Sequence, residues 1–332
     1  MFKRLLFHVL SMLYGLITSC RNALYDQKIF GSKHFDRPTT LVIGNLAVGG
    51  TGKSPFVAYL VRNWPFQERL GILSRGYGRK TNGFRLVETH CKASEVGDEP
   101  LAYKLQMPDI TVAVCEKRVI GVENLQNNVD TLFLDDAFQH RAIQGDVNLL
   151  CTTYDKPFFA DKLLPLGRLR ESSAGIKRAQ AIIVNRCPEV ISEAKKSAFE
   201  SFSLPVFYSR VTYGLPVGPN SHEIKQWNLV AGIADPMPFF KQAKSLGDII
   251  NQESYADHYA FQTADFQYWE YIAKQCQEDT GILTTHKDYM RFQEHLAEYP
   301  NLTAHLYYLP MQMEFVSQES EFWAWLTQSL KR

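Results

Sequence analysis

The chain has 332 residues and a formal net charge of +1, and hydrophobic residues make up 45% of it. This length is typical of two ordinary domains with substantial cores. The balanced charge argues against a general affinity for nucleic acid. The six cysteines form no Cys-x-x-Cys pair, which argues against a zinc knuckle or a disulfide framework.

The N-terminal segment begins with an amphipathic pattern. Apolar side chains between Phe2 and Ile17 recur at the spacing of a single helical stripe. The stretch is shorter than the roughly 20 residues that a membrane-spanning helix needs, and polar residues interrupt it. Three interpretations stay open: a signal peptide ending near Cys20, a helix packed on its own domain, and an interfacial helix in a bilayer surface. We assign residues 1–30 to a membrane-associating unit.

A strand, a glycine-rich loop and a helix are predicted in succession between residues 39 and 64. The β-rich run 39–44 leads into the loop, and periodic apolar residues follow from 55 to 64. The loop residues are Gly49, Gly50, Thr51, Gly52, Lys53 and Ser54.

This loop matches the phosphate-binding pattern G-x-x-x-x-G-K-[ST], apart from Ala47 at the first position. Glycines let backbone N–H groups converge on a phosphate, and the positive end of the following helix adds to the attraction. Lys53 would reach the β- and γ-phosphates of ATP, and the Ser54 hydroxyl would bind Mg²⁺. The motif therefore predicts a site for ATP with Mg²⁺.

Further strand-like runs alternate with helical patterns along the chain. They lie at 70–74, 110–114, 131–134, 147–151 and 181–184. This alternation is typical of a parallel, doubly wound α/β sheet. A segment rich in Pro, Gly and Ser then leads into a smaller α/β unit. We therefore predict an α/β fold with a P-loop NTPase parallel-sheet domain at 31–205 and a second, smaller α/β domain at 206–332.

Two adjacent carboxylates, Asp135 and Asp136, follow the apolar run 131–134. Ligands of open α/β sheets bind at the carboxyl ends of the strands, and Mg²⁺ bound with a nucleotide takes carboxylate ligands. The alternative is a solvated turn. With the P-loop present, we assign both carboxylates to the metal and nucleotide site, which Gln139 and His140 would line.

Three other stretches place charges next to predicted elements, at 73–79, 97–100 and 165–171. Each has an ordinary explanation as a basic loop or a helix cap. None of the three identifies a reaction by itself.

Taken together and in this order, these stretches resemble the tetraacyldisaccharide 4'-kinases of lipid A synthesis. The matching segments are 44–45, 49–55, 73–78, 97–100, 135–140, 164–171, 231–236, 257–258 and 287–288. They span nearly the whole chain. Ser54, Ala137 and His286 stand where the family commonly has threonine, glycine and glutamate.

The resemblance implies a kinase that transfers the γ-phosphate of ATP to the 4'-hydroxyl of a lipid A disaccharide 1-phosphate, giving lipid IVA. It implies that Asp98 accepts the proton of that hydroxyl, with support from the Asp257-His258 pair of the second domain, and that Lys53 shares in catalysis. The implied substrate contacts are Asn45, Arg75, Tyr77, Arg118 and Arg170, and the implied metal-site residues are Ser54, Glu99, Asp135 and Asp136.

An acylated disaccharide resides in the inner leaflet of the membrane. The resemblance therefore also implies an enzyme at the cytoplasmic face of the inner membrane, held there peripherally or as a monotopic protein. Neither a nucleic acid nor an obligate protein partner is indicated. Two rivals are a dimeric P-loop ATPase, which commonly carries a lysine where this chain has Val48, and a non-catalytic nucleotide switch.

Overall fold

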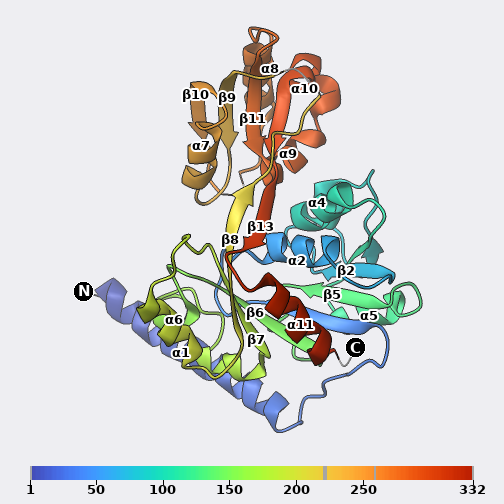
Figure 1. Ribbon diagram of the computed structural model, residues 1–332, viewed down its shortest axis with the longest axis vertical. Coiled ribbons are helices and arrows are strands. Elements are labelled where there is room, and N and C mark those ends of the chain that lie inside the picture. Colours follow the sequence, from blue (N-terminus) through green and yellow to red (C-terminus); the bar gives the residue numbers. More distant parts are fainter. Residues whose placement is uncertain (1, 220–222, 258, 331–332) are drawn as a thin grey trace.

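A nine-stranded sheet forms the centre of the larger of two lobes in the computed structural model, which describes residues 2–219, 223–257 and 259–330 (Figure 1). The strand order is β13-β8-β7-β6-β1-β5-β2-β4-β3. The strands are β1 (Thr39–Gly44), β2 (Leu70–Ser74), β3 (Arg85–Leu86), β4 (Thr111–Val114), β5 (Thr131–Asp135), β6 (Val147–Thr153), β7 (Ala181–Asn185), β8 (Val206–Tyr213) and β13 (Met311–Phe315). Only the edge strands β3 and β13 pair antiparallel to their neighbours. The predicted parallel α/β sheet is thus confirmed.

Helices cover both faces of this sheet, which explains why its strands are continuous apolar runs and not alternating ones. Leu41 and Ile43 of β1 point into one core cluster with α2 (Lys53–Arg62), α4 (Asp98–Gln106) and α11 (Glu319–Ser329). Val42 points into the opposite cluster with α5 (Arg118–Leu125) and α6 (Glu193–Glu200). The remaining helices of this lobe are α1 (Phe2–Asp26), α3 (Ala93–Val96), η1 (Phe158–Ala160) and η2 (Ser173–Arg178).

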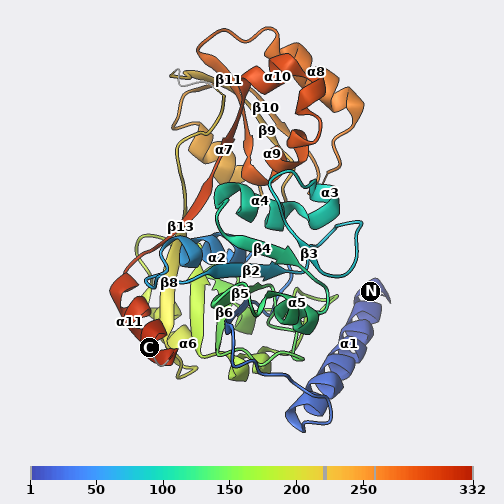
Figure 2. The same ribbon diagram turned by 90° about the vertical axis from the view of Figure 1, so that its right-hand side faces the viewer.

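The smaller lobe contains a second sheet of four parallel strands in the order β10-β9-β11-β12. Its elements are β9 (Gln226–Ala231), α7 (Met237–Ala243), β10 (Asp248–Ser254), α8 (Thr263–Ala273), β11 (Thr280–Thr285), α9 (His286–Gln293), η3 (Leu296–Glu298), α10 (Pro300–His305) and β12 (Leu306–Leu309). Figure 2 shows α9 of this lobe above α3 and α4 of the larger one, and α4 and α9 are in contact.

The chain leaves the larger lobe through β8 and returns through β13, and these two strands pair with each other. β8, β13 and α11 therefore extend the nine-stranded sheet and its cover, although they lie within the segment 206–332 expected to form the second domain. The four-stranded sheet is an insertion between two adjacent strands of the larger one.

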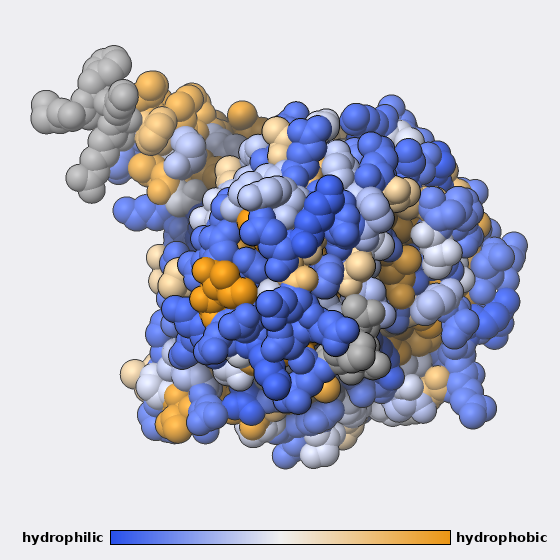
Figure 3. All heavy atoms as spheres, turned by 90° about the horizontal axis from the view of Figure 1, so that it is seen from above, coloured by the Kyte–Doolittle hydropathy of each residue, from blue (hydrophilic) through white to orange (hydrophobic). Residues whose placement is uncertain are grey.

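Helix α1 lies along the larger lobe and confirms the predicted N-terminal helix, which continues to Asp26. One edge contacts the body, where Ser11 donates a hydrogen bond to the Leu163 carbonyl oxygen at 3.0 Å. The opposite side leaves Leu16 and Ile17 63% and 67% exposed. Figure 3 shows hydrophobic atoms gathered on a part of the molecule that extends beyond the rounded body. Among the described residues, no helix combines the length and the hydropathy needed to cross a membrane.

Candidate active site

The glycine-rich loop between β1 and α2 is supported from two sides. Gly52 adopts a φ of 81°, and a Cβ atom on it would lie 2.8 Å from the Asn185 side chain. Asn185, which ends β7, donates to the Thr51 carbonyl oxygen at 2.6 Å, and Asn45, directly after β1, donates to the Thr51 hydroxyl at 2.8 Å. This packing requires glycine at position 52 and presents the backbone N–H groups of the loop at the positive end of α2.

Lys53, the first residue of α2, faces the second carboxylate of the acidic pair. Its Nζ lies 3.5 Å from Asp136 Oδ1, and Arg170 Nη1 donates to Asp136 Oδ2 at 2.9 Å. Burial acts to raise the pKa of Asp136, but Lys53 and Arg170 outweigh burial and hold this pKa below its usual value. Asp136 is therefore ionised between two cations, and the cluster lies where the phosphates of a nucleotide on the loop would end.

The first carboxylate, Asp135, lies deeper in the protein. Burial raises the pKa of Asp135 to about 7, with added contributions from Glu99 and Asp136. The Tyr103 hydroxyl lies 3.4 Å from Asp135 Oδ2 and 3.5 Å from the carbonyl oxygen of Ser54, so it ties the acid to the start of α2. Because the pKa of Asp135 is raised to about 7, a cation that binds beside this carboxyl group favours loss of its proton.

The residues present fit a Mg²⁺ ion bound together with ATP. Among the described residues, Asp135 Oδ1 is buried without a hydrogen-bond partner, and Asp136 Oδ1 is buried with no partner but the ion pair to Lys53 Nζ at 3.5 Å. Buried oxygens of this kind are costly unless they are paired. Within the same residues, no group of three His, Cys, Asp or Glu side chains is placed to hold a metal by itself. Such a sparse set suits Mg²⁺, which completes its shell with phosphate oxygens and water.

Asp98 opens α4 at the boundary between the lobes. Arg291 of α9 donates to Asp98 Oδ2 from Nε at 3.1 Å and from Nη2 at 3.0 Å. Arg291 is itself held by the buried Asp288, 2.9 Å from Nη1, and by the Gly232 carbonyl oxygen. The smaller lobe thus fixes the orientation of Asp98, the residue that the sequence resemblance places at the sugar hydroxyl.

Two residues expected as substrate contacts lie inside the protein. Arg118 is 2% exposed, and its guanidinium donates to the carbonyl oxygens of Cys115 and Asp135. Burial lowers the pKa of Arg118 to about 10, although the charges of Asp135 and Asp136 act to raise this pKa. Asn45 is likewise inside the protein and engaged with Thr51. Arg118 therefore supports the end of β5, and Asn45 supports the phosphate loop.

The other expected substrate residues are accessible. Arg75 and Tyr77 follow β2 and are exposed, and Tyr77 has 75% of its surface free. His140 is half-buried, and burial together with Arg118 and Arg75 lowers its pKa to about 4. The imidazole is therefore neutral near pH 7. Gln139 donates to the carbonyl oxygen of Asn45 at 2.7 Å, which ties it to the start of the phosphate loop.

Glu99, Asp257 and His258 are the other residues assigned to catalysis or the metal. Glu99 is exposed in the first turn of α4 and close enough to Asp135 to raise its pKa. Asp257 is exposed in the segment between β10 and α8. His258, its expected partner in supporting Asp98, lies outside the described residues.

Sequence reasoning missed several residues of the site. Arg186 follows β7 as Asp136 follows β5, and its Nη2 lies 3.2 Å from where a Cβ atom on Gly50 would be. The rule that ligands gather at strand ends could have found it. Arg291 and Asn22, which contacts Glu171, carry no local signal, because their partners are distant in sequence.

A phosphate loop, one lysine, one buried carboxylate and one half-buried carboxylate at the carboxyl edge of a parallel sheet place this chain among the P-loop phosphotransferases. The sequence profile described as tetraacyldisaccharide-1-P 4'-kinase matches residues 3–331. The chain therefore belongs to the tetraacyldisaccharide 4'-kinase family.

Individual relatives agree with this assignment. A tetraacyldisaccharide 4'-kinase of Flavobacterium johnsoniae is 37% identical over 97% of this chain and 95% of its own length. Another from Cytophaga hutchinsonii is 37% identical over 96% and 94%. A crystal structure of LpxK from Aquifex aeolicus in complex with ATP superposes with a TM-score of 0.76 at 28% identity, covering 97% of both chains.

Proposed function

We propose that the chain transfers the γ-phosphate of ATP to the 4'-hydroxyl of an acylated glucosamine disaccharide 1-phosphate, the reaction that gives its family its name. One observation carries the proposal. Helix α4, which begins with Asp98 at the lobe boundary, also places the Tyr103 hydroxyl 3.4 Å from Asp135 Oδ2 and 3.5 Å from the Ser54 carbonyl oxygen, so one helix joins this acid to the phosphate site. A nucleotide site beside a fixed acid is the requirement for transfer to an alcohol.

The loop from Gly49 to Ser54 holds the triphosphate in this proposal, with Lys53 at the β- and γ-phosphates. Ser54, Asp135 and Asp136, with Glu99 nearby, would hold Mg²⁺. When bound, Mg²⁺ neutralises the charge that develops on the transferred phosphoryl group. Asp136 keeps Lys53 and Arg170 oriented towards the same place, because it pairs with both.

Asp98 accepts the proton of the sugar hydroxyl as that oxygen attacks the γ-phosphorus. Both Arg291 donors use Oδ2, so Oδ1 is left for the hydroxyl among the described residues. An aspartate at the end of an arginine fork is held in one orientation, which a positioned base requires. The Asp257-His258 pair supports this acid from the smaller lobe, and Arg75 and Tyr77 contact the disaccharide.

The enzyme works at the cytoplasmic face of the inner membrane, where its acylated substrate resides. The exposed apolar side of α1 supports docking in the bilayer surface, because an amphipathic helix buries such a stripe among the acyl chains. The rest of the helix stays with the body through polar contacts.

The deciding experiment incubates purified protein with Mg²⁺-ATP and the disaccharide 1-phosphate in detergent micelles, and resolves the lipid products by mass. The expected product is the substrate enlarged by one phosphate, with one ADP formed for each product. ATP hydrolysis without a phosphorylated lipid would point to the rival ATPase. Nucleotide binding without turnover would point to the switch.

A further inference from the structure

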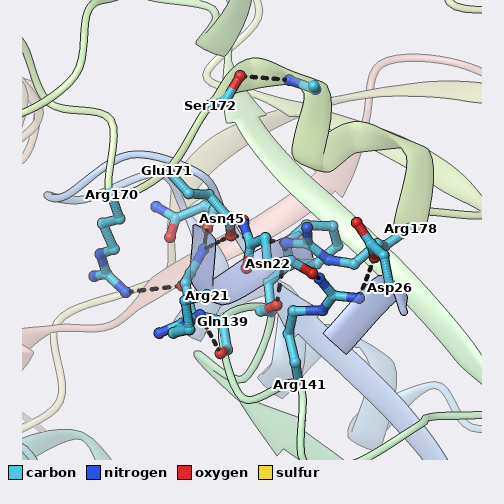
Figure 4. A network of polar contacts seen from close by, with 12 residues as sticks. Arg21, Asn22, Asp26, Asn45, Gln139, Arg141, Arg170, Glu171, Ser172 and Arg178 are labelled. Carbon is cyan, nitrogen blue, oxygen red and sulfur yellow. Dashed lines mark hydrogen bonds and ion pairs between the residues drawn. The ribbon is translucent and has the colours of Figure 1, made fainter. Parts of the chain in front are cut away.

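The inner edge of α1 contacts residues that surround the phosphate site (Figure 4). The Tyr14 hydroxyl donates to the Arg170 carbonyl oxygen at 2.7 Å, and Asn22 Nδ2 donates to Glu171 Oε2 at 2.6 Å. Arg21, the residue before Asn22, donates from Nη2 to the Gln139 carbonyl oxygen at 3.0 Å. These bonds link positions more than a hundred residues apart, so the helix is part of the tertiary structure of the site.

Glu171 is the junction of this network. Its side chain is almost wholly buried, and Oε1 accepts from Arg178 Nη2 at 2.7 Å and from Gln139 Nε2 at 3.0 Å. Asn22 supplies the donor for the other oxygen. A buried carboxylate needs every such donor, because removal of one leaves part of the charge unpaired in a medium of low dielectric constant.

From this junction the contacts continue to the lysine of the phosphate loop. Gln139 Oε1 accepts from Arg170 Nη1 at 3.4 Å, the same Nη1 donates to Asp136 at 2.9 Å, and Asp136 faces Lys53 at 3.5 Å. Tyr14 thus holds the backbone of Arg170, and Asn22 holds the side chain of Glu171, the next residue in the sequence.

We propose that Tyr14 and Asn22 are positioning residues, through which α1 fixes Arg170 and Glu171 for phosphoryl transfer. The inference rests on the proposed function and adds to it, since it gives the N-terminal helix a role in catalysis separate from membrane docking. The helix has two sides with two tasks. The apolar side faces outward, and the polar edge sets where Arg170 lies relative to Asp136 and the γ-phosphate.

The physical reason for an effect on rate is alignment. Without the Tyr14 and Asn22 bonds, the segment at 170–171 loses a donor to its backbone and a donor to its buried carboxylate. A displacement of about 1 Å in a group that orients charge at the reacting phosphate can cost about 100-fold in rate. The loop from Gly49 to Ser54 keeps the side-chain supports of Asn45 and Asn185. The 170–171 segment meets the chain before that loop, where the Arg170 N–H donates to the Leu46 carbonyl oxygen at 2.7 Å.

The test uses the full-length chain with Tyr14→Phe and Asn22→Leu, assayed with the disaccharide 1-phosphate in detergent micelles. We expect kcat to fall about 10- to 100-fold in Asn22→Leu and less in Tyr14→Phe, while the KM for ATP and co-sedimentation with anionic vesicles stay as in the wild type. Thr18→Ala is the matched control, because within the described part of the chain the Thr18 hydroxyl bonds only to the carbonyl oxygens of Tyr14 and Gly15 in the same helix.

A double-mutant cycle separates positioning from a general loss of structure. If Asn22 acts through Arg170, Asn22→Leu costs little further rate in an Arg170→Ala background. Equal losses in both backgrounds, or wild-type kcat in both Tyr14→Phe and Asn22→Leu, would overturn the proposal. Tyr14→Phe removes one hydroxyl alone and keeps the test valid if Asn22→Leu fails to fold. A wild-type protein that phosphorylates no lipid would instead refute the proposed function.

Discussion

Arg291 and Asp98 join the two lobes through a fork in which both arginine donors, Nε and Nη2, meet a single carboxylate oxygen. The arrangement fixes the carboxylate plane while leaving the second oxygen for another partner. It comes from residues 193 positions apart. Asp98 of the larger lobe is therefore oriented by the smaller one.

The first prediction concerns this fork. Arg291→Met should lower kcat by about 100-fold, because Asp98 loses the group that orients it, while the Kd for ATP changes little. Arg69→Ala is a matched control, since Arg69 forms a similar fork with Asp130 on the exposed surface. Isothermal titration with a non-hydrolysable ATP analogue and steady-state kinetics give the two readouts. A variant that loses ATP affinity and keeps kcat would contradict the assignment.

Asp98→Ala tests the acid itself. General-base assistance contributes about 100- to 10,000-fold, so turnover should fall within that range while ATP binding is retained. Phosphorylated lipid is quantified by mass under single-turnover conditions, which exclude an effect on product release. Turnover near the wild-type value would remove Asp98 from the chemistry.

The raised pKa of Asp135 predicts a pH-dependent requirement for Mg²⁺. Below about pH 7 the carboxyl is protonated in the free protein, and a cation must displace the proton. The Mg²⁺ concentration for half-maximal rate should therefore rise as the pH falls from 8 to 6. In Asp135→Asn this pH dependence should disappear along with most of the activity. An unchanged Mg²⁺ requirement across this range in the wild type would refute the assignment.

The same carboxyl predicts a trade between stability and function. Its folded pKa lies above its unfolded value, so the folded state holds the proton more tightly and loses stability as the pH rises from about 4 to about 7. Asp135→Asn removes that loss, and in metal-free buffer at pH 8 its melting temperature should exceed that of the wild type. Equal melting temperatures in EDTA at pH 8 would show that burial imposes no such cost.

Membrane docking is tested by the outward side of α1. Leu13→Ser and Leu16→Ser combined remove apolar surface that is 52% and 63% exposed, and should weaken co-sedimentation with anionic vesicles about 10-fold or more. Cys20→Ser, an exposed change on the same helix, should leave co-sedimentation unaltered. Full vesicle binding by the double variant would place the membrane contact elsewhere.

The sequence alone predicts those parts of the site that are local in the chain. The loop at 49–54 is contiguous, and Asp135 and Asp136 directly follow a strand, so their meeting point follows from the rules of parallel sheets. The resemblance implies Arg118 as a substrate contact, and nothing local in the sequence indicates that the fold directs its guanidinium inward to backbone oxygens.

Long-range partners could not be predicted in this way. Neither Asn22 nor Arg291 belongs to a motif, and each acquires its role only when folding brings it to Glu171 or Asp98. The return of the chain to the first sheet was also missed. β13 is a short edge strand that follows the whole smaller lobe, and its five residues give no sign of which sheet they join.

Because β8 pairs with β13, the smaller lobe is an insertion that could be removed without breaking the larger sheet. Tyr213 and Met311 are register partners, so the chain that spans them enters and leaves at adjacent points of one sheet. A tight reverse turn in place of residues 214–310 would join the two strands as a hairpin and leave the nucleotide-holding half intact in outline. Such a shortened protein should still capture ATP, yet Asp98 would have no Arg291. Binding of the nucleotide should therefore need the larger lobe alone, whereas the orientation of Asp98 needs both lobes.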